Sequence, residues 1–205
     1  STLSGNRIQT RTVPALAEEV VDNNTLLDTE RGIVVTAGNI DISTTWSDPG
    51  YVYVIEGDVT VDALNTLTIA PGAVLKFQVA RTSYNQNDRD LIVNGTLIAD
   101  GTAMLPVVFT SFYDDTYGGD TNIDGIATLP GPGDWGRIYF SEGNGSSLTN
   151  ATVVYGGGGN PGPCCSVHNP PSDSTVRSAG ARAPTFDGLL VEQSQARGLY
   201  VNISG

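Results

Sequence analysis

The chain has 205 residues, of which 39% are hydrophobic and only 16% are charged, and it contains 25 glycines and 11 prolines. A chain of this length can bury a core as one domain, and its turn-forming composition is typical of many short strands. With 22 acidic residues against 10 Lys and Arg, the formal net charge is −12, which argues against nucleic acid and anionic membranes as partners and favours divalent cations.

The first part of the chain differs from the rest. Residues 14–24 (PALAEEVVDNN) have a modest helical pattern, and residues 32–37 (GIVVTA) then predict a strand because they are β-branched and apolar. No run in the sequence approaches the ~18 apolar residues that a membrane span needs, so we expect no membrane insertion. We treat residues 1–43 as one N-terminal segment.

From residue 51 onward the sequence is a series of short apolar or β-branched runs separated by Pro-Gly, Asn-Gly and Asp-Gly. Such runs predict strands, which we place at 51–57, 59–61, 66–69, 73–77, 91–93, 96–99, 107–110, 137–140 and 151–157. The connections are too tight for crossover helices, which excludes a doubly wound α/β sheet. An all-β sandwich or an all-β solenoid remains.

Internal similarity favours the solenoid. The run at 67–69 before Pro71-Gly72 recurs at 91–93 before Asn94-Gly95, an offset of 24 residues, and a repeat of this length suits one circuit of a solenoid. We therefore expect residues 44–205 to form a solenoid with Asp-, Asn-, Gly- or Pro-rich insertions at 78–90, 112–134 and 158–182. The side chains expected in its core are Leu67, Ile69, Leu91, Val93, Leu97, Val107, Phe109, Ile138 and Phe140.

The ends of such a rod need protection, because a terminal circuit exposes apolar side chains and unpaired backbone groups. Residues 1–43 are expected to cap one end, or to be donated to a second copy through 32–37 as an added strand. At the other end we expect an apolar surface covered by another polypeptide, either the chain's continuation or a second copy that would extend into a filament. Its residues are Leu189, Leu190, Val191, Leu199, Tyr200 and Val201.

Several sequence blocks resemble a known kind of repeat. They are TTW (44–46), YVYVIEGDVTV (51–61), TLTIAPGAVLKF (66–77), LIVNGTLIADGT (91–102), VVFTS (107–111), PGDWGRIYF (132–140) and LTNATVVYGG (148–157). In this order they resemble the right-handed parallel β-helix repeats of large bacterial and archaeal surface proteins. The resemblance implies a right-handed parallel β-helix in a secreted or surface-exposed scaffold, such as an adhesin, and it names no ligand. The fold hosts enzymes and passive rods alike.

The insertion at 112–134 contains a candidate metal site. The sequence DTNIDG at 120–125 repeats the first half of a calcium loop, in which alternate oxygen side chains face one cation and the glycine permits a sharp turn. Gly131 stands where an EF-hand has its bidentate Glu, which excludes an EF-hand. Similar Asp-rich insertions precede the DWG block in the resembled proteins. The alternative is that these residues only form turns. The expected calcium ligands are Asp114, Asp115, Asp120, Asn122 and Asp124.

Two further functions remain open as alternatives. Polysaccharide lyases of β-helix type pair calcium with a Lys or Arg base, and hydrolases pair two carboxylates. Lys76 alternates with Leu75 and Phe77 and is interpreted as an outward side chain, and His168 has no evident partner, so we expect no enzyme activity. A carbohydrate-binding surface would stack sugars on aromatic rings, with burial under the insertions as the alternative. Its candidates are Trp135, Tyr51, Tyr53, Tyr113, Tyr117 and Tyr139.

Sequons and cysteines suggest where the chain resides. N-x-S/T sequons make glycosylation candidates of Asn23, Asn94, Asn144, Asn150 and Asn202. Cys164 and Cys165 are adjacent, so free thiols, a strained vicinal disulfide and bridges to another subunit are the three open states. The sequence as a whole predicts a structural building block of an extracellular, calcium-stabilised surface protein or filament.

Overall fold

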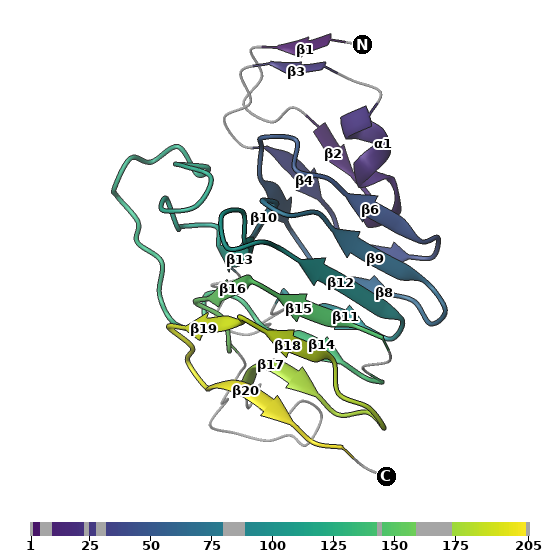
Figure 1. The fold of residues 1–205 in the computed structure, drawn as a ribbon. Helices are drawn as coiled ribbons and strands as arrows, with labels where there is room; N and C mark the ends of the chain where they lie inside the picture. Colours follow the sequence, from purple (N-terminus) through teal and green to yellow (C-terminus); the bar gives the residue numbers. More distant parts are fainter. Residues whose placement is uncertain are drawn as a thin grey trace, which may run out of the picture.

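The computed structural model describes residues 2–4, 10–22, 25–27, 32–79, 89–142, 145–158 and 174–203. These residues form an all-β structure dominated by three parallel sheets (Figure 1). From β4 to β20 the chain enters the three sheets in strict rotation, one strand in each. This arrangement is compatible with a parallel β-helix. The described part of the chain contains no helix long and apolar enough to cross a membrane.

From β4 onward each sheet takes every third strand, β2 adds one more strand to the edge of sheet 1, and the pairings among the described residues are parallel. Sheet 1 contains β2 (Thr10–Thr12), β4 (Ile33–Val35), β7 (Tyr53–Ile55), β10 (Val74–Phe77), β13 (Val107–Ser111), β16 (Ala151–Val154) and β19 (Leu190–Glu192). Sheet 2 contains β5 (Gly38–Ile40), β8 (Val59–Val61), β11 (Leu91–Val93), β14 (Ile138–Phe140), β17 (Ser174–Ser178) and β20 (Arg197–Val201). Sheet 3 contains β6 (Thr44–Trp46), β9 (Thr66–Ile69), β12 (Thr96–Asp100), β15 (Ser147–Thr149) and β18 (Thr185–Asp187).

The core consists of columns of apolar side chains that stack from circuit to circuit. Side chains alternate between the two faces of a strand, and the parallel register puts inward residues of successive circuits next to one another. One column in sheet 1 is Ile33, Tyr53, Leu75, Phe109, Val153 and Val191. One column in sheet 3 is Trp46, Ile69, Ala99, Leu148 and Phe186. All nine core residues predicted from the sequence are at most 1% exposed, which confirms the inward positions.

The 24-residue offset does not correspond to one circuit. Treating the runs 67–69 and 91–93 as equivalent positions of successive circuits was therefore wrong. The run at 67–69 lies in sheet 3, whereas 91–93 lies in sheet 2. The register partner of Leu67 is Leu97, and the partner of Leu91 in the preceding circuit is Val59. A Leu/Ile/Val run before a turn occurs at more than one corner of the circuit, so it does not identify a sheet.

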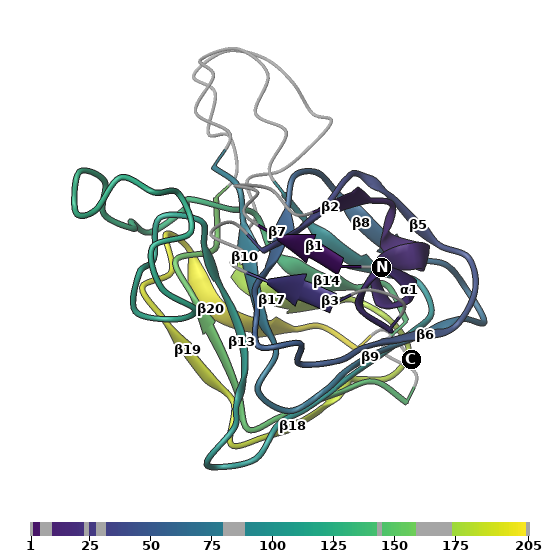
Figure 2. The same cartoon turned by 90° about the horizontal axis from the view of Figure 1, so that it is seen from above.

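The N-terminal segment lies at one end of the stack, and the two chain termini lie at opposite ends (Figure 1). The 3-10 helix η1 (Pro14–Leu16) continues into α1 (Ala17–Asp22), close to the predicted helical range. Ala17 is fully buried, and the Trp46 indole Nε1–H donates to the Pro14 carbonyl at 3.2 Å. A separate parallel pair, β1 (Thr2–Ser4) with β3 (Thr25–Leu27), lies beyond α1. Viewed along the stack, the circuits superpose around one interior (Figure 2).

Two predicted boundaries differ from those of the structure. The sheets begin before residue 44, because β4 is buried and paired on both sides with β2 and β7. Its residues lie within 32–37, so donating that strand to a second copy would require it to leave two neighbours. The predicted insertion 158–182 contains the sheet 2 strand β17. That strand was missed because its inward positions include the serines Ser174 and Ser178, which are fully buried here.

Candidate functional site

The three insertions leave the sheets at the same corner of the circuit. The segments 78–90, 112–134 and the start of 158–182 connect β10 to β11, β13 to β14 and β16 to β17, which are all crossings from sheet 1 to sheet 2. By contrast, β4 to β5 and β7 to β8 cross the same corner in tight turns. Insertions gathered on one face of a repeat protein are commonly its binding face. Within them, residues 80–88 and 159–173 lie outside the described residues.

The insertion 112–134 projects from this corner and is organised by its own side chains (Figures 1 and 2). The Asp120 carboxylate accepts hydrogen bonds from the backbone N–H groups of Ile123 and Gly125, both at 2.8 Å. These hydrogen bonds, led by the one from Gly125, lower the pKa of Asp120. Asp124 accepts from the Asn122 amide at 2.9 Å and from the Thr128 hydroxyl. The predicted half-loop is therefore a turn closed by its own carboxylates.

Lys76 anchors this insertion from below. It lies on β10 with a fully buried side chain, and its ammonium donates to the Gly119 carbonyl at 2.6 Å and to the Thr121 hydroxyl at 2.8 Å. Burial lowers its pKa from 10.5 to about 8, although Asp114, Asp115 and other acidic side chains nearby favour the charged form. The side chain of Lys76 points outward from β10, as predicted, and it is buried because the insertion covers this face.

The remaining two predicted ligands differ in their surroundings. Asp114 is 1% exposed, and its carboxylate accepts from the Thr110 hydroxyl and from the Thr116 N–H. The Oδ1 atom of Asp115 is buried without a hydrogen-bond partner among the described residues. Desolvation, with the charge of Asp120 second, raises the pKa of Asp115. Asp115 is thus the carboxylate least satisfied by the protein itself.

These donors fit a calcium ion only in part. The described residues include no group of three or more His, Cys, Asp or Glu side chains close enough to hold a metal. Oxygens of Asp114, Asp120 and Asp124 already accept hydrogen bonds, and the Lys76 ammonium brings one positive charge under the loop. Calcium binding by Asp114, Asp115, Asp120, Asn122 and Asp124 stays a prediction. Sequence reasoning missed the anchoring role of Lys76, although the only lysine on an otherwise apolar strand was a usable signal.

The predicted aromatic sugar-binding surface is not formed by all of its candidates. Trp135 is 1% exposed, stacks on Phe77 with ring centroids 4.2 Å apart, and donates its indole N–H to the Val154 carbonyl at 2.8 Å. Tyr53 is fully buried beside Trp46, and burial raises the pKa of its hydroxyl. Both residues are core residues, which supports burial rather than sugar stacking. Half-buried positions are occupied by Tyr51, Tyr113, Tyr117 and Tyr139.

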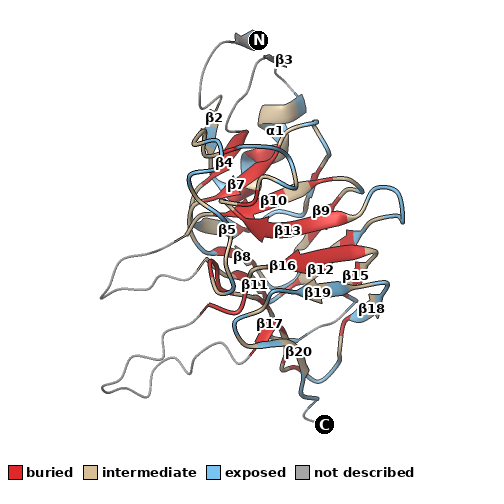
Figure 3. Cartoon of the chain, turned by 90° about the vertical axis from the view of Figure 1, so that its left-hand side faces the viewer, coloured by how far each residue is buried: buried red, intermediate tan, exposed pale blue. Residues whose placement is uncertain are grey.

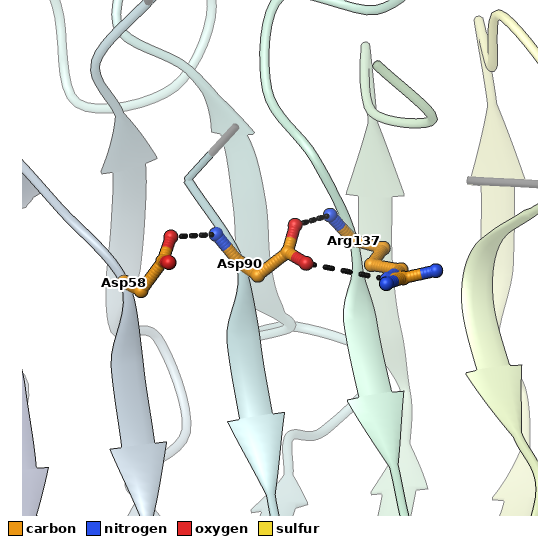
Figure 4. A network of polar contacts seen from close by, with 3 residues as sticks. All are labelled: Asp58, Asp90 and Arg137. Carbon is orange, nitrogen blue, oxygen red and sulfur yellow. Dashed lines mark hydrogen bonds and ion pairs between the residues drawn. The ribbon is translucent and has the colours of Figure 1, made fainter. Parts of the chain in front are cut away.

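The outer face of sheet 2 changes its charge along the stack. At the start of successive strands, Asp90 N–H donates to Asp58 at 3.1 Å, and Arg137 donates to the Asp90 carboxylate through its backbone N–H at 3.0 Å and its Nε at 3.2 Å (Figure 4). Further along, the guanidinium groups of Arg137 and Arg177 lie 5.2 and 5.9 Å from the centroid of the Tyr139 ring. Aspartates therefore give way to arginines toward the C-terminal end.

The last circuit forms the apolar surface that the sequence predicted. Leu190, Leu199 and Val201 are 45%, 42% and 40% exposed, whereas Val176, the register partner of Leu199, is fully buried. The strands β18, β19 and β20 each have one strand neighbour among the described residues. The burial map shows the loss of buried surface toward this end (Figure 3). We call this surface the open end, made of Phe186, Leu189, Leu190, Val191, Leu199 and Val201.

The modification candidates are only partly described. Asn94 and Asn202 are exposed, as N-glycosylation requires. Asn150 is half-buried with φ 44°, and its amide donates to the Gly101 carbonyl at 3.3 Å. Asn23, Asn144, Cys164, Cys165 and His168 lie outside the described residues.

Comparison with known proteins gives no relative for this chain. No family model, no curated protein and no solved structure matches it. The functional argument therefore rests on the geometry of the chain itself.

Proposed function

We propose that the chain is a right-handed parallel β-helix that serves as an extracellular structural building block of a surface protein or filament. Strand twist makes parallel crossovers right-handed in nearly all known proteins, which supports the handedness. The acidic composition and the sequons support an exported protein. In this proposal the corner insertions decorate a rod whose length is set by the number of circuits.

The observation that carries this proposal is the difference between the two ends. At the N-terminal end, η1 and α1 pack over the first circuits, with Pro14 and Ala17 buried. At the open end, the same apolar columns finish at half-exposed side chains such as Leu199 and Val201. The exposed edges of the last strands and the last side chains of the core columns form a surface that one more circuit of the solenoid would cover. We infer that another polypeptide covers it, as the chain's continuation or as a second copy.

The open end can be tested by adding charge to it. In sedimentation velocity and electron microscopy, we expect the chain to self-associate, and Leu199→Asp together with Val201→Asp to abolish the association because a buried charge without a partner is costly. Ile42→Asp is the matched control, since Ile42 is 70% exposed in a turn of the first circuit. Self-association that survives the double substitution, or a monomeric unsubstituted chain, would exclude a second copy as the cover.

A structural role also predicts no catalysis on polysaccharides. The one buried lysine of the described chain is held by Gly119 and Thr121 rather than directed at an open cleft with a paired carboxylate. We expect no unsaturated or reducing ends from polygalacturonate or alginate above background. Product release that is lost with Lys76→Ala or Asp114→Ala would contradict the structural proposal and favour a polysaccharide lyase or hydrolase.

A further inference from the structure

Two sequons hold their asparagine side chains in opposite ways, and they begin at Asn94 and at Asn150. Asn94 is exposed in the turn after β11, and its amide oxygen accepts a hydrogen bond from the Ser141 hydroxyl at 2.9 Å. This contact uses only the oxygen of the amide. Among the described residues the Asn94 Nδ2 has no hydrogen-bond partner, so the atom to which an N-linked glycan attaches is accessible.

The Asn150 amide is instead packed between the backbones of the two adjacent circuits. It is half-buried, and its Nδ2 donates to the Gly101 carbonyl at 3.3 Å. Its Oδ1 faces Gly188, where an added Cβ would lie only 2.9 Å from this oxygen. Because a glycan needs space around Nδ2 at the surface, the folded chain favours the sequon at Asn94 over the sequon at Asn150.

Exposed apolar side chains lie beside Asn94. Leu64 is 100% exposed in the turn between β8 and β9, and its φ of 71° is one that leucine rarely adopts. Ile42, in the turn at the same corner of the preceding circuit, is 70% exposed. The turn that holds Leu64 contacts the sequon directly, because an added Cβ on Gly95 would lie 2.3 Å from the carbonyl oxygens of Asp62 and Asn65. Apolar side chains that gather in one place on a surface commonly mark a covered site.

We propose that Asn94 carries an N-linked glycan whose first sugars lie over the turn at 62–65 and cover Leu64. In the transfer, Asn94 Nδ2 forms a bond to the anomeric carbon of a sugar held on a lipid-linked diphosphate donor, and Nδ2 loses one proton. The bond from the anomeric carbon to the diphosphate oxygen breaks, and the lipid diphosphate leaves. The donor and the transferring enzyme belong to the cell that exports the chain.

The turn chemistry alone accounts for only part of this arrangement. An Asn-Gly pair suits a tight turn without any glycan, which explains Gly95 and leaves the exposure of Leu64 unexplained. The C–H groups on one face of a sugar ring match an aliphatic side chain, since contact between them removes apolar surface from water. The glycan rests on the export that the proposed function assumes, and it is independent of how the open end is covered.

The attachment site is tested by peptide mass spectrometry of the 205-residue chain, secreted by a host that glycosylates such sequons. Enzymatic removal of N-glycans converts an occupied asparagine to aspartate, which marks its position. We expect this mark at Asn94 and none at Asn150. Thr96→Ala keeps Asn94 and removes the sequon, so it should abolish the mark. An unstructured tag with its own sequon verifies that the host has glycosylated the preparation.

The result separates this site from the structural role of the chain. A glycosylated tag with an unmodified Asn94, or an Asn150 modified as fully as Asn94, would overturn the proposal. Neither outcome changes the expected self-association through the open end, which has its own test. Conversely, a monomeric chain that carries the glycan at Asn94 would leave this proposal standing.

The cover over Leu64 is tested with a dye that fluoresces on exposed apolar surface. The glycosylated chain should bind less dye than Thr96→Ala or Asn94→Gln, which lose the glycan by two different substitutions. In a Leu64→Ser background these differences should disappear, because the side chain that the glycan covers is gone. Circular dichroism verifies that all variants keep the unsubstituted fold. Equal dye binding by the glycosylated chain and both variants would show that the glycan does not cover Leu64.

Discussion

Replacing Lys76 with methionine tests whether a buried ammonium organises the corner insertion. Methionine keeps a long apolar side chain on β10, and it removes the donor to the Gly119 carbonyl and the Thr121 hydroxyl. Methionine also packs differently from lysine, so the change in stability at one pH combines the loss of the charge with a change in packing. The pH dependence of the unfolding free energy isolates the charge.

The magnitude follows from the pKa of Lys76, which falls from 10.5 to about 8 on folding. Between these two values the unfolded chain binds one more proton than the folded chain, so stability increases as the pH rises. Below pH 8 both states are protonated and this contribution is flat. Each pH unit in the window is worth about 1.4 kcal/mol, which gives a gain of about 2 kcal/mol between pH 8 and pH 9.5.

The assay is urea unfolding at several pH values from 7 to 9.5, for the unsubstituted chain and for Lys76→Met. This range stays below the titration of ordinary tyrosines near pH 10. The difference in unfolding free energy between the two proteins should rise by about 2 kcal/mol across the upper part of the range. Arg182→Met, at an exposed position, is expected to follow the unsubstituted chain. Parallel profiles for the unsubstituted chain and Lys76→Met would refute a desolvated ammonium at this position.

Three further predictions concern the insertion, the core and one turn. Chelation should lower the melting temperature, because an ion bound only by the folded state stabilises it, and Asp120→Ala with Asp124→Ala should remove this response; an unchanged Tm in chelator eliminates calcium from the insertion. Trp135→Ala should lower the unfolding free energy by about 3–5 kcal/mol in chemical denaturation, as expected for a large buried aromatic residue, and a loss below about 1 kcal/mol would contradict its core position. Gly95→Ala should destabilise by about 1–3 kcal/mol, because its Cβ would lie 2.3 Å from two backbone carbonyl oxygens. Gly131→Ala is the control, because its new Cβ meets nothing closer than 3.8 Å. Equal Tm values for the two variants would disprove a steric clash as the cause of the destabilisation by Gly95→Ala.

The local sequence pattern was sufficient to predict the strands and the core residues in the middle of the chain. The predicted runs at 59–61, 66–69 and 91–93 coincide with β8, β9 and β11. These strands alternate apolar inward residues with outward ones and end at turn residues, so each can be predicted from its own few residues. Where the inward positions are polar, as at Ser174 and Ser178 of β17, the pattern fails and the strand was missed.

The composition and the local alternation of apolar residues indicated that the chain is all-β, where most of its strands lie and which side chains form its core. Only the tertiary structure decided which strand pairs with which, because a circuit varies in length with its insertions and sequence offset does not give register. That register brings the connections that carry the insertions to one corner, buries Lys76 beneath the insertion at 112–134, and makes Tyr139, Arg177 and Tyr200 direct neighbours. Contacts between residues far apart in sequence depend on the stacking of whole circuits, and a local pattern does not contain that information.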